Sequence, residues 1–273
     1  MVLKKIERKI SFLLKRMTEY PLIPLKDKLD NNDTSIYTIP KNVYQTWENN
    51  LFGKKHYKEL VKFRNLNNNY NFFIFDKDKR DQYMEQYWSK NNIYQVYKKA
   101  RYGQIKADIF RYCILYERGG FYFDISKGCN VCLDELYDSS SEAVISNEPI
   151  ECIIPPDQSI FNKLKYPWNN FLQWGLGFKK NHILLNMIID AISNDYQYYV
   201  NTTFHKPKTA VLSLSATGQF TKIVREYFKI YGFDKVEQVG IYFNNHGIFS
   251  MKGSRVRHHL VKEYADIRDD HVL

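Results

Sequence analysis

Short runs of apolar and aromatic residues alternate along the chain with longer stretches in which apolar residues recur every three or four positions. The short runs are typical of buried strands, and the longer stretches are typical of helices packed on a core. The runs predict strands at residues 42–45, 71–75, 121–124, 143–146 and 172–178. The stretches predict helices at residues 55–66, 79–88, 101–118, 183–193 and 216–231. This alternation favours an α/β fold with a mostly parallel sheet and helices on both faces.

The first twenty residues carry a helical pattern of their own, with lysine and arginine at most of the polar positions. Its apolar positions are Leu3, Ile6, Ile10, Leu13 and Met17. Such a basic amphipathic helix can bind the surface of an anionic membrane, or it can pack on a folded domain, and the pattern leaves both open. Charges interrupt the apolar stretch and no small-residue cleavage site follows it, so we do not expect a signal peptide. We interpret residues 1–38 as this helix and a linker, followed by one domain at residues 39–273.

The most informative segment is 107–126, ADIFRYCILYERGGFYFDIS, which predicts a helix, a double-glycine stop and a buried strand that ends in a carboxylate. Asp108 and Arg111 are three positions apart, so their side chains can pair on the helix. Asp124 and Ser126 point the same way if the chain stays extended. Asp124 falls at the carboxyl end of its strand, where an open α/β sheet usually binds a ligand.

Each of these features has an ordinary structural interpretation when it is taken alone. Asp108 and Arg111 can be a surface ion pair of the helix, and Asp124 can cap a loop. Their occurrence together, in this order and spacing, favours a binding site instead.

The same segment resembles the "kaDilRy..Ly..GG.Y.D.D" core of the DXD-type glycosyltransferases of family 32. The segment 39–47, IPKNVYQTW, is similar to the opening strand of that family, and 69–76, NYNFFIFD, is similar to its second strand. Thr217 and Gly218 lie where the family has Thr-Gly-Pro, and His258 and His259 lie near its late histidine. The likeness is specific in the first half of the chain and loose after about Leu136.

The resemblance implies a Rossmann-like fold of the GT-A type that transfers a hexose from a nucleotide-diphosphate sugar, with retention, to a glycan or lipid-linked acceptor. It implies that Asp108, Arg111 and Asp124 are the catalytic group. It also implies side chains that surround the sugar donor: Trp47 at the base, and Tyr122 with the Ser126 position beside Asp124. Gln45 and Thr46 can line the nucleotide pocket as further donor-binding residues, or they are ordinary polar residues at the end of a strand.

One position departs from the family, because Ser126 replaces the second acidic residue of the DXD motif. In the family, this acid helps to hold a Mn²⁺ or Mg²⁺ ion on the donor diphosphate, and a neutral hydroxyl is a weaker ligand for a hard cation. Asp124 can still bind the ion, helped by His258, His259 or water. Alternatively, Lys127 can replace part of the charge of the ion, or activity is lost.

The composition of the chain limits which partners and functions remain possible. The formal charge of +10 suits anionic partners, but it is spread along the chain and no nucleic-acid-binding motif occurs, so no nucleic-acid partner is expected. Four cysteines do not make a disulfide framework in 273 residues, and no apolar run is long enough to span a membrane. We therefore expect a cytoplasmic protein, soluble or peripheral at a membrane. The alternatives to an active transferase are a non-catalytic relative that binds nucleotide sugars or glycans, and a basic membrane-surface protein.

Overall fold

The strands predicted in the first half of the chain lie side by side in the central sheet. The structure is a computed structural model, and it describes residues 22–29, 36–255 and 267–273. The strand order in the sheet is β11-β7-β9-β5-β2-β4, and β8 pairs with β7. These strands are β2 (Asn42–Thr46), β4 (Asn71–Phe75), β5 (Gly120–Phe123), β7 (Ala143–Glu151), β8 (Asn169–Phe171), β9 (Gly175–Phe178) and β11 (Val236–Ile241). Strands β11 and β7 are parallel, and so are β5, β2 and β4, whereas β9 is antiparallel to β5 and β7 and β8 is antiparallel to β7; the predicted mostly parallel sheet is confirmed.

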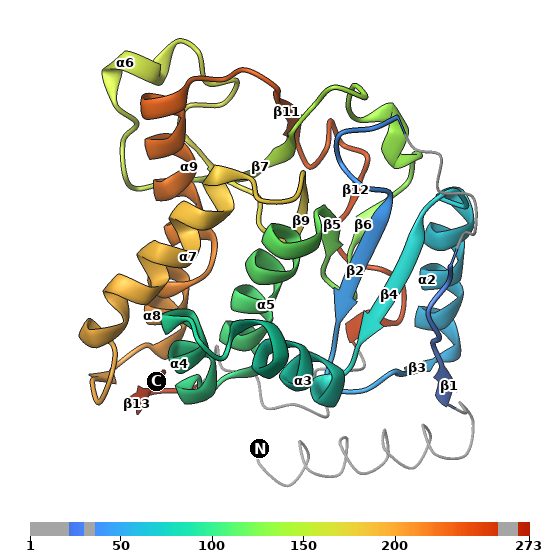
Figure 1. Cartoon of the computed structure of the whole chain (residues 1–273), viewed down its shortest axis with the longest axis horizontal. Helices are drawn as coiled ribbons and strands as arrows, with labels where there is room; N and C mark the ends of the chain where they lie inside the picture. The colour runs from blue at the N-terminus through green and yellow to red at the C-terminus, as the bar shows by residue number, and fades with distance from the viewer. Residues whose placement is uncertain (1–21, 30–35, 256–266) are drawn as a thin grey trace, which may run out of the picture.

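Residues alternate between two buried faces of this sheet, as the period of two in a strand requires. On β2, Val43 packs into one core and Tyr44 into the other, and on β5 the side chain of Tyr122 faces away from those of Phe121 and Phe123. Both faces are therefore covered. One core contains α2, and the other contains most of the remaining helices (Figure 1).

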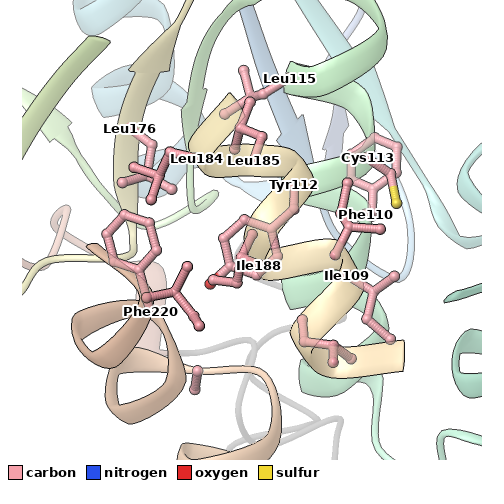
Figure 2. Close-up of a cluster of buried hydrophobic side chains, with 14 of the residues drawn as sticks. Ile109, Phe110, Tyr112, Cys113, Leu115, Leu176, Leu184, Leu185, Ile188 and Phe220 are labelled. Carbon is pink, nitrogen blue, oxygen red and sulfur yellow. The ribbon is translucent and has the colours of Figure 1, made fainter. Parts of the chain in front are cut away.

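The helices of the described residues agree with most of the predicted stretches. They are α2 (Lys54–Leu66), α3 (Lys77–Trp88), α4 (Asn92–Lys99), α5 (Gly103–Arg118), α6 (Gln158–Phe161), α7 (Ile183–Asp195), α8 (Pro207–Leu214) and α9 (Thr217–Tyr231). Helix α5 is central, and its residues Ile109 and Tyr112 pack with Leu185 and Ile188 of α7 (Figure 2). This packing fixes the face of α5 that carries the predicted site.

Four local predictions need correction. Strand β5 ends at Phe123, and the chain turns at Asp124 instead of continuing extended, because the amide of Lys127 bonds to the carbonyl of Asp124 at 2.8 Å. The strand predicted at 172–178 begins only at Gly175, as β9, and the three residues 172–174 separate it from β8. Strand β7 is longer than predicted and ends at Glu151. Helices α4 and α8 and strand β11 were not predicted.

Part of the predicted linker packs on the domain. Strand β1 (Leu22–Pro24) pairs with β3 (Leu51–Gly53), and Leu25 is buried in the core that contains α2. The short strands β6 (Gly128–Cys129) and β12 (Gly247–Ile248) also pair, as do β10 (Thr203–Phe204) and β13 (Asp270–His271). The predicted amphipathic helix lies outside the described residues. Within the described ranges, no helix has the length and hydropathy that crossing a membrane would need.

Candidate functional site

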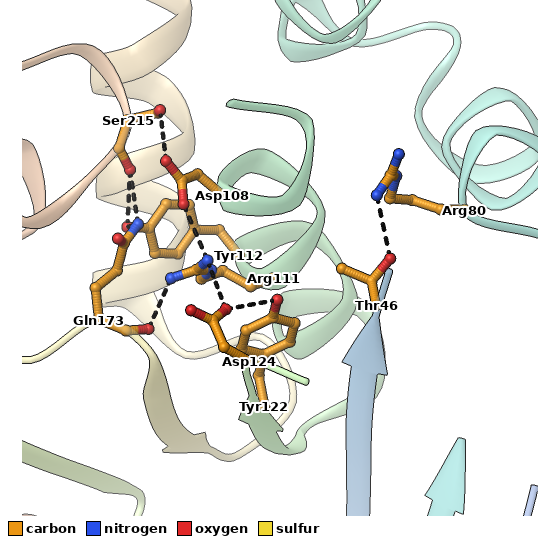
Figure 3. Close-up of polar contacts among 9 residues, drawn as sticks. All are labelled: Thr46, Arg80, Asp108, Arg111, Tyr112, Tyr122, Asp124, Gln173 and Ser215. Carbon is orange, nitrogen blue, oxygen red and sulfur yellow. Dashed lines mark hydrogen bonds and ion pairs between the residues drawn. The ribbon is translucent and has the colours of Figure 1, made fainter. Parts of the chain in front are cut away.

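Arg111 holds the two predicted carboxylates together. Its Nη2 atom lies 2.9 Å from Asp108 Oδ1 and 3.0 Å from Asp124 Oδ1 (Figure 3). Asp108 and Arg111 come from α5, and Asp124 follows β5, as the spacing of the segment predicted. The hydroxyl of Tyr122 also donates to Asp124 Oδ1 at 3.0 Å, and the guanidinium lies over the Tyr122 ring. The structure therefore brings together four of the residues that the sequence singled out.

Side chains and carbonyls from the second half of the chain complete this group. Ser215 donates to Asp108 Oδ2 at 2.9 Å, and Arg111 Nη1 donates to the carbonyl of Gln173 at 2.8 Å (Figure 3). The Gln173 amide in turn donates to the Tyr112 hydroxyl at 2.6 Å. Asp108 and Arg111 are buried, whereas about a third (32%) of the Asp124 side chain is exposed. The group is thus buried except for the carboxylate of Asp124, which is partly open to solvent.

Burial makes the charges of this group costly. It raises the pKa of Asp108 to about 7, and the attraction of Arg111 and the hydrogen bond from Ser215 only partly oppose the rise. Burial alone would lower the pKa of Arg111, but the negative charges of Asp124 and Asp108 raise it above its ordinary value, so the guanidinium stays charged. Titratable groups perturbed by burial and specific partners in a cleft are typical of functional sites.

A cleft opens over this group at the carboxyl edge of β2 and β5. The first half of the chain contributes Trp47, Asp108 and Asp124 to its lining, and the second half contributes Gln173, Trp174 and Thr217, among others. The predicted residues Thr46, Arg111 and Tyr122 also line it. Its position fits the rule that open α/β sheets bind ligands beyond the carboxyl ends of their strands.

Three predicted residues have surroundings that the sequence did not indicate. The hydroxyl of Thr46 lines the cleft but already donates to the Phe75 carbonyl and accepts from Arg80. Gln45 is fully buried and does not line the cleft, and neither polar atom of its side chain bonds to any residue that the structure describes. Ser126 is buried in the turn after Asp124 and does not line the cleft, whereas Lys127 does.

The cleft is lined by three cations, Arg80, Arg111 and Lys127, and by four carboxylates, Glu48, Asp108, Asp124 and Glu148, so an anionic ligand would have to lie against the cationic groups. Lys127 and Arg111 line it, and so do the first residues of α5 and α9, at Gly103 and Thr217. Neither helix has a side-chain hydrogen bond at its N-cap. Uncapped backbone amides and the helix dipole favour a phosphate at such ends. The Thr217–Gly218 pair, which the sequence only matched loosely, thus begins a helix at the cleft.

The residues present could hold a divalent cation through one carboxylate oxygen. The side-chain hydrogen bonds and ion pairs of Asp124 with described residues all involve Oδ1, and its carboxylate is partly exposed to the cleft. No group of three or more His, Cys, Asp or Glu suited to a metal occurs within residues 22–29, 36–255 and 267–273. His258 and His259, predicted as further ligands, lie outside these ranges. A cation here would depend on oxygens of its substrate.

Sequence reasoning missed several residues of the site. Arg80 of α3 is buried and bonds to Thr46, to Tyr97 and to Glu48. Glu148 of β7 lines the cleft. Gln173 acts partly through its backbone carbonyl, which residue type cannot reveal. Residue type and spacing gave no signal for Arg80, because its burial against Thr46, Tyr97 and Glu48 is defined only by the fold.

Comparisons with known proteins agree with this geometry. Residues 5–143 match a family described as "Glycosyltransferase sugar-binding region containing DXD motif". An "Initiation-specific alpha-1,6-mannosyltransferase" of Candida albicans is 26% identical over 210 residues, covering 69% of this chain and 53% of that protein. "Inositol phosphoceramide mannosyltransferase 3" of Schizosaccharomyces pombe is 33% identical over 100 residues, covering 36% of this chain and 27% of that protein.

The chain thus spans about half or less of the length of these curated relatives. Among solved structures, "PaToxG Glycosyltransferase" is similar in fold, with a TM-score of 0.50 and 18% identity over 84% of this chain and 78% of that one. This likeness confirms the predicted GT-A type of fold.

Proposed function

The chain belongs to the family of glycosyltransferases whose sugar-binding region contains a DXD motif, and on this premise we propose that it transfers a hexose from a nucleotide-diphosphate sugar to a hydroxyl acceptor. The observation that carries the proposal is the Asp108–Arg111–Asp124 group at the floor of a cleft on the carboxyl edge of the sheet. The names of the relatives make mannose the first sugar to test and inositol phosphoceramide one acceptor to test, beside the glycans and lipid-linked acceptors that the family resemblance implies.

The proposed roles follow from the charges of the reaction. Breaking the bond between sugar and phosphate builds positive charge on the anomeric carbon and negative charge on the leaving diphosphate. Asp108 would accept hydrogen bonds from hydroxyls of the donor sugar, because Arg111 and Ser215 hold its carboxylate in one orientation. Arg111, Lys127 and the amino end of α5 would stabilise the diphosphate in the cleft. Trp47 would lie against the base of the nucleotide. Retention of the anomeric configuration is part of the proposal, taken from the family.

A divalent cation is proposed as a cofactor with one protein ligand. Asp124 would hold Mn²⁺ or Mg²⁺ together with oxygens of the diphosphate, and the bound ion would neutralise charge on the leaving group. The buried position of Ser126 favours weaker metal binding than two carboxylates would give.

The same observation supports a second candidate function. A relative that binds nucleotide sugars without transferring them would keep the Asp108–Arg111 pair and tolerate the loss of an acidic ligand at Ser126. Turnover separates the two candidates.

The test is a thermal-shift screen of nucleotide sugars, such as GDP-mannose and UDP-glucose, with and without Mn²⁺, followed by assays of transfer and hydrolysis. A ligand at about 100 times its Kd stabilises a protein by about 2.7 kcal/mol. We expect one nucleotide sugar to raise the unfolding temperature and to be consumed. Binding without consumption would favour the non-catalytic candidate, and no binding by any nucleotide sugar would refute both.

A further inference from the structure

Glu148 is a carboxylate in the cleft that the family motif does not include. It lines the same cleft as Asp124 and Lys127, and its strand, β7, lies in the loosely matched half of the chain. Its side chain is half-buried. No role for Glu148 follows from the sequence or from the proposed donor site.

The backbone around Glu148 contains a β-bulge. In the pairing of β7 with β8, Asn147 is opposite Phe171 but Glu151 is opposite Asn169, so the three residues between them on β7 face a single residue of β8. Such a bulge turns the strand and re-aims its side chains, and bulges are common beside active sites. The Asn169 side chain fixes this bulge by donating to the carbonyl of Glu148 at 2.9 Å.

The order of strands places Glu148 at the end of the cleft away from the proposed nucleotide. In the sheet, β2, which precedes Trp47, is followed by β5, which precedes Asp124, and then by β9 and β7 (Figure 1). The cleft is lined by residues that follow or belong to these strands, among them Trp47, Asp124 and Glu148. Strands lie about 4.8 Å apart, so β7 is about 10 Å from β5 and about 14 Å from β2. A nucleotide over β2 and a diphosphate at Asp124 would leave the β7 end for the second substrate.

Aromatic rings stand beside Glu148 at this end. Trp174 lines the cleft but is only 5% exposed, and its ring lies 5.9 Å from that of Tyr242, a half-buried residue at the margin of the cleft, which lies 5.6 Å from that of the exposed Phe249. The amide of Tyr242 donates to the carbonyl of Asn147 at 2.9 Å, which ties these rings to the strand of Glu148.

The backbone that presents Tyr242 is strained. Residues 242–245 all have φ between 45° and 67°, although none is glycine. Asn244 and Asn245 adopt this conformation readily, but for Tyr242 and Phe243 it costs of order 1–3 kcal/mol each, and such strain clusters at ligand sites. The strain is an independent sign that this turn is held for a purpose.

We infer that Glu148 and the half-buried ring of Tyr242, with Trp174 packed behind them, form the acceptor subsite, in which a pyranose ring of the acceptor lies against Tyr242 and one of its hydroxyls donates a hydrogen bond to Glu148. The inference rests on the proposed function and names its second substrate by class, a sugar with a free hydroxyl. An aromatic face matches the apolar C–H face of a sugar ring, and an ionised carboxylate accepts hydroxyl protons from its edge.

Electrostatics agrees with this placement. Burial raises the pKa of Glu148 to about 7; the positive charge of Lys127 opposes the rise and the negative charge of Asp124 adds to it. A desolvated carboxylate in a cleft makes stronger hydrogen bonds than one in water. The charged form of a half-buried carboxylate costs free energy unless a hydrogen-bond donor or a cation faces it.

The test compares Glu148→Gln with Glu151→Gln, which changes an exposed carboxylate on the same strand outside the cleft. Methyl hexosides serve as acceptors, and two donor-only readouts accompany transfer: hydrolysis of the nucleotide sugar without acceptor, and its thermal shift. We expect Glu148→Gln to raise the KM for the best methyl hexoside about tenfold or more, with both donor readouts unchanged. Glu151→Gln should behave as the wild type. Tyr242→Leu should also raise that KM.

Several results would overturn the inference. An unchanged hexoside KM in Glu148→Gln and Tyr242→Leu would place the acceptor elsewhere. Equal losses of hydrolysis and transfer in Glu148→Gln would assign Glu148 to the donor. Intact donor hydrolysis by the wild type without transfer to any hexoside would refute an acceptor sugar. Failure of the wild type to bind or hydrolyse any nucleotide sugar would instead refute the proposed function itself.

Discussion

Ser215 donates a hydrogen bond of 2.9 Å to Asp108, although 107 positions separate the two residues along the chain. The second carboxylate oxygen of Asp108 faces Arg111 at 2.9 Å. Asp108 is thus fixed from its own helix on one side and from the end of α8 on the other. This double contact leads to the first prediction.

Ser215→Ala should weaken both the fold and the site. The substitution leaves Asp108 Oδ2, a buried oxygen, without its hydroxyl partner, and a lost bond to a charged group costs about 1.5–3 kcal/mol. Urea unfolding should show a loss of this size, and transfer should slow more than nucleotide binding weakens. Ser213→Ala removes a hydroxyl from an exposed position of α8 and serves as the control. Equal stability of the two variants would contradict the assignment of the Ser215 bond.

Asp108→Asn should reduce the use of the donor sugar without reducing nucleotide binding. The amide keeps the size of the carboxylate and loses its charge, and a misplaced hydrogen-bonding group at a reacting centre costs about 10²–10³ in turnover. Kinetics with the best nucleotide sugar, together with the Kd of the free nucleotide diphosphate, measure the two effects. If the Kd rose as much as turnover fell, Asp108 would be a structural residue.

Asp124→Ala should abolish transfer while the protein stays folded. Asp124 is partly exposed, and Arg111 keeps Asp108 as a partner when Asp124 is removed. We expect turnover to fall by about 10³ or more, with a normal circular dichroism spectrum. Asp138→Ala, at an exposed position outside the cleft, should have full activity. Activity retained in Asp124→Ala would refute the assigned site.

Removal of divalent cations should stop turnover, and restoring it should need more Mn²⁺ or Mg²⁺ than a site with two carboxylates needs. The reason is that Asp124 offers one acidic ligand and the diphosphate supplies the other oxygens. The measurement is turnover against metal concentration after EDTA treatment, in the wild type and in Lys127→Ala. Lys127→Ala should reduce turnover only slightly when metal is present. Undiminished turnover in EDTA, together with an inactive Lys127→Ala, would mean that the lysine replaces the ion.

Stability should fall as the pH drops from about 6.5 to about 4, in part because of His182. Burial lowers the pKa of His182 to about 4, with Lys179 adding to the shift, so in this window the unfolded chain binds a proton that the folded chain does not. A difference of about 2.5 pH units from the usual 6.5 corresponds to roughly 3 kcal/mol. Protonation also removes the Nδ1 acceptor that caps α7 through the amide of Leu184.

The measurement is urea unfolding at pH 7, 6 and 5 for the wild type and His182→Asn. Asparagine can cap a helix but does not titrate, so the variant should lose less stability across this window. Parallel pH profiles for the two proteins would show that His182 contributes nothing to the acid dependence.

The parts of the site that could be predicted are those set by local spacing. Asp108 and Arg111 pair because they are three positions apart on a helix, and Asp124 lies at the cleft because it follows a buried strand. Ser126 was misplaced because the chain turns after Asp124, and one backbone bond between Asp124 and Lys127 decides that turn.

The remaining parts depend on contacts between distant segments. Arg80 meets Thr46 across 34 positions, and the side chain of Glu148 enters the cleft because of a bulge that only the pairing of two strands defines. The sequence predicted β9 and the three residues before it as one strand, because a continuous apolar run does not show where hydrogen bonding between strands begins or ends. Such features follow from tertiary packing, which residue type and spacing do not encode.

The reversed direction of β9 has a consequence for how the site comes into being. Because β9 runs against its neighbours, the residues that precede it arrive at the cleft, and the carbonyls of Gln173 and Trp174 bond to Arg111 Nη1 and to the amide of Asp124. All three residues of the Asp108–Arg111–Asp124 group have been synthesised before Gln173, yet their geometry depends on it and on Ser215. The formed site therefore depends on contacts of high sequence separation, whose loop-closure entropy must be overcome before they stabilise anything. A chain that carries the whole motif but lacks β9, the two residues before it and Ser215 would lack the two carbonyls and the hydroxyl that hold the motif in place.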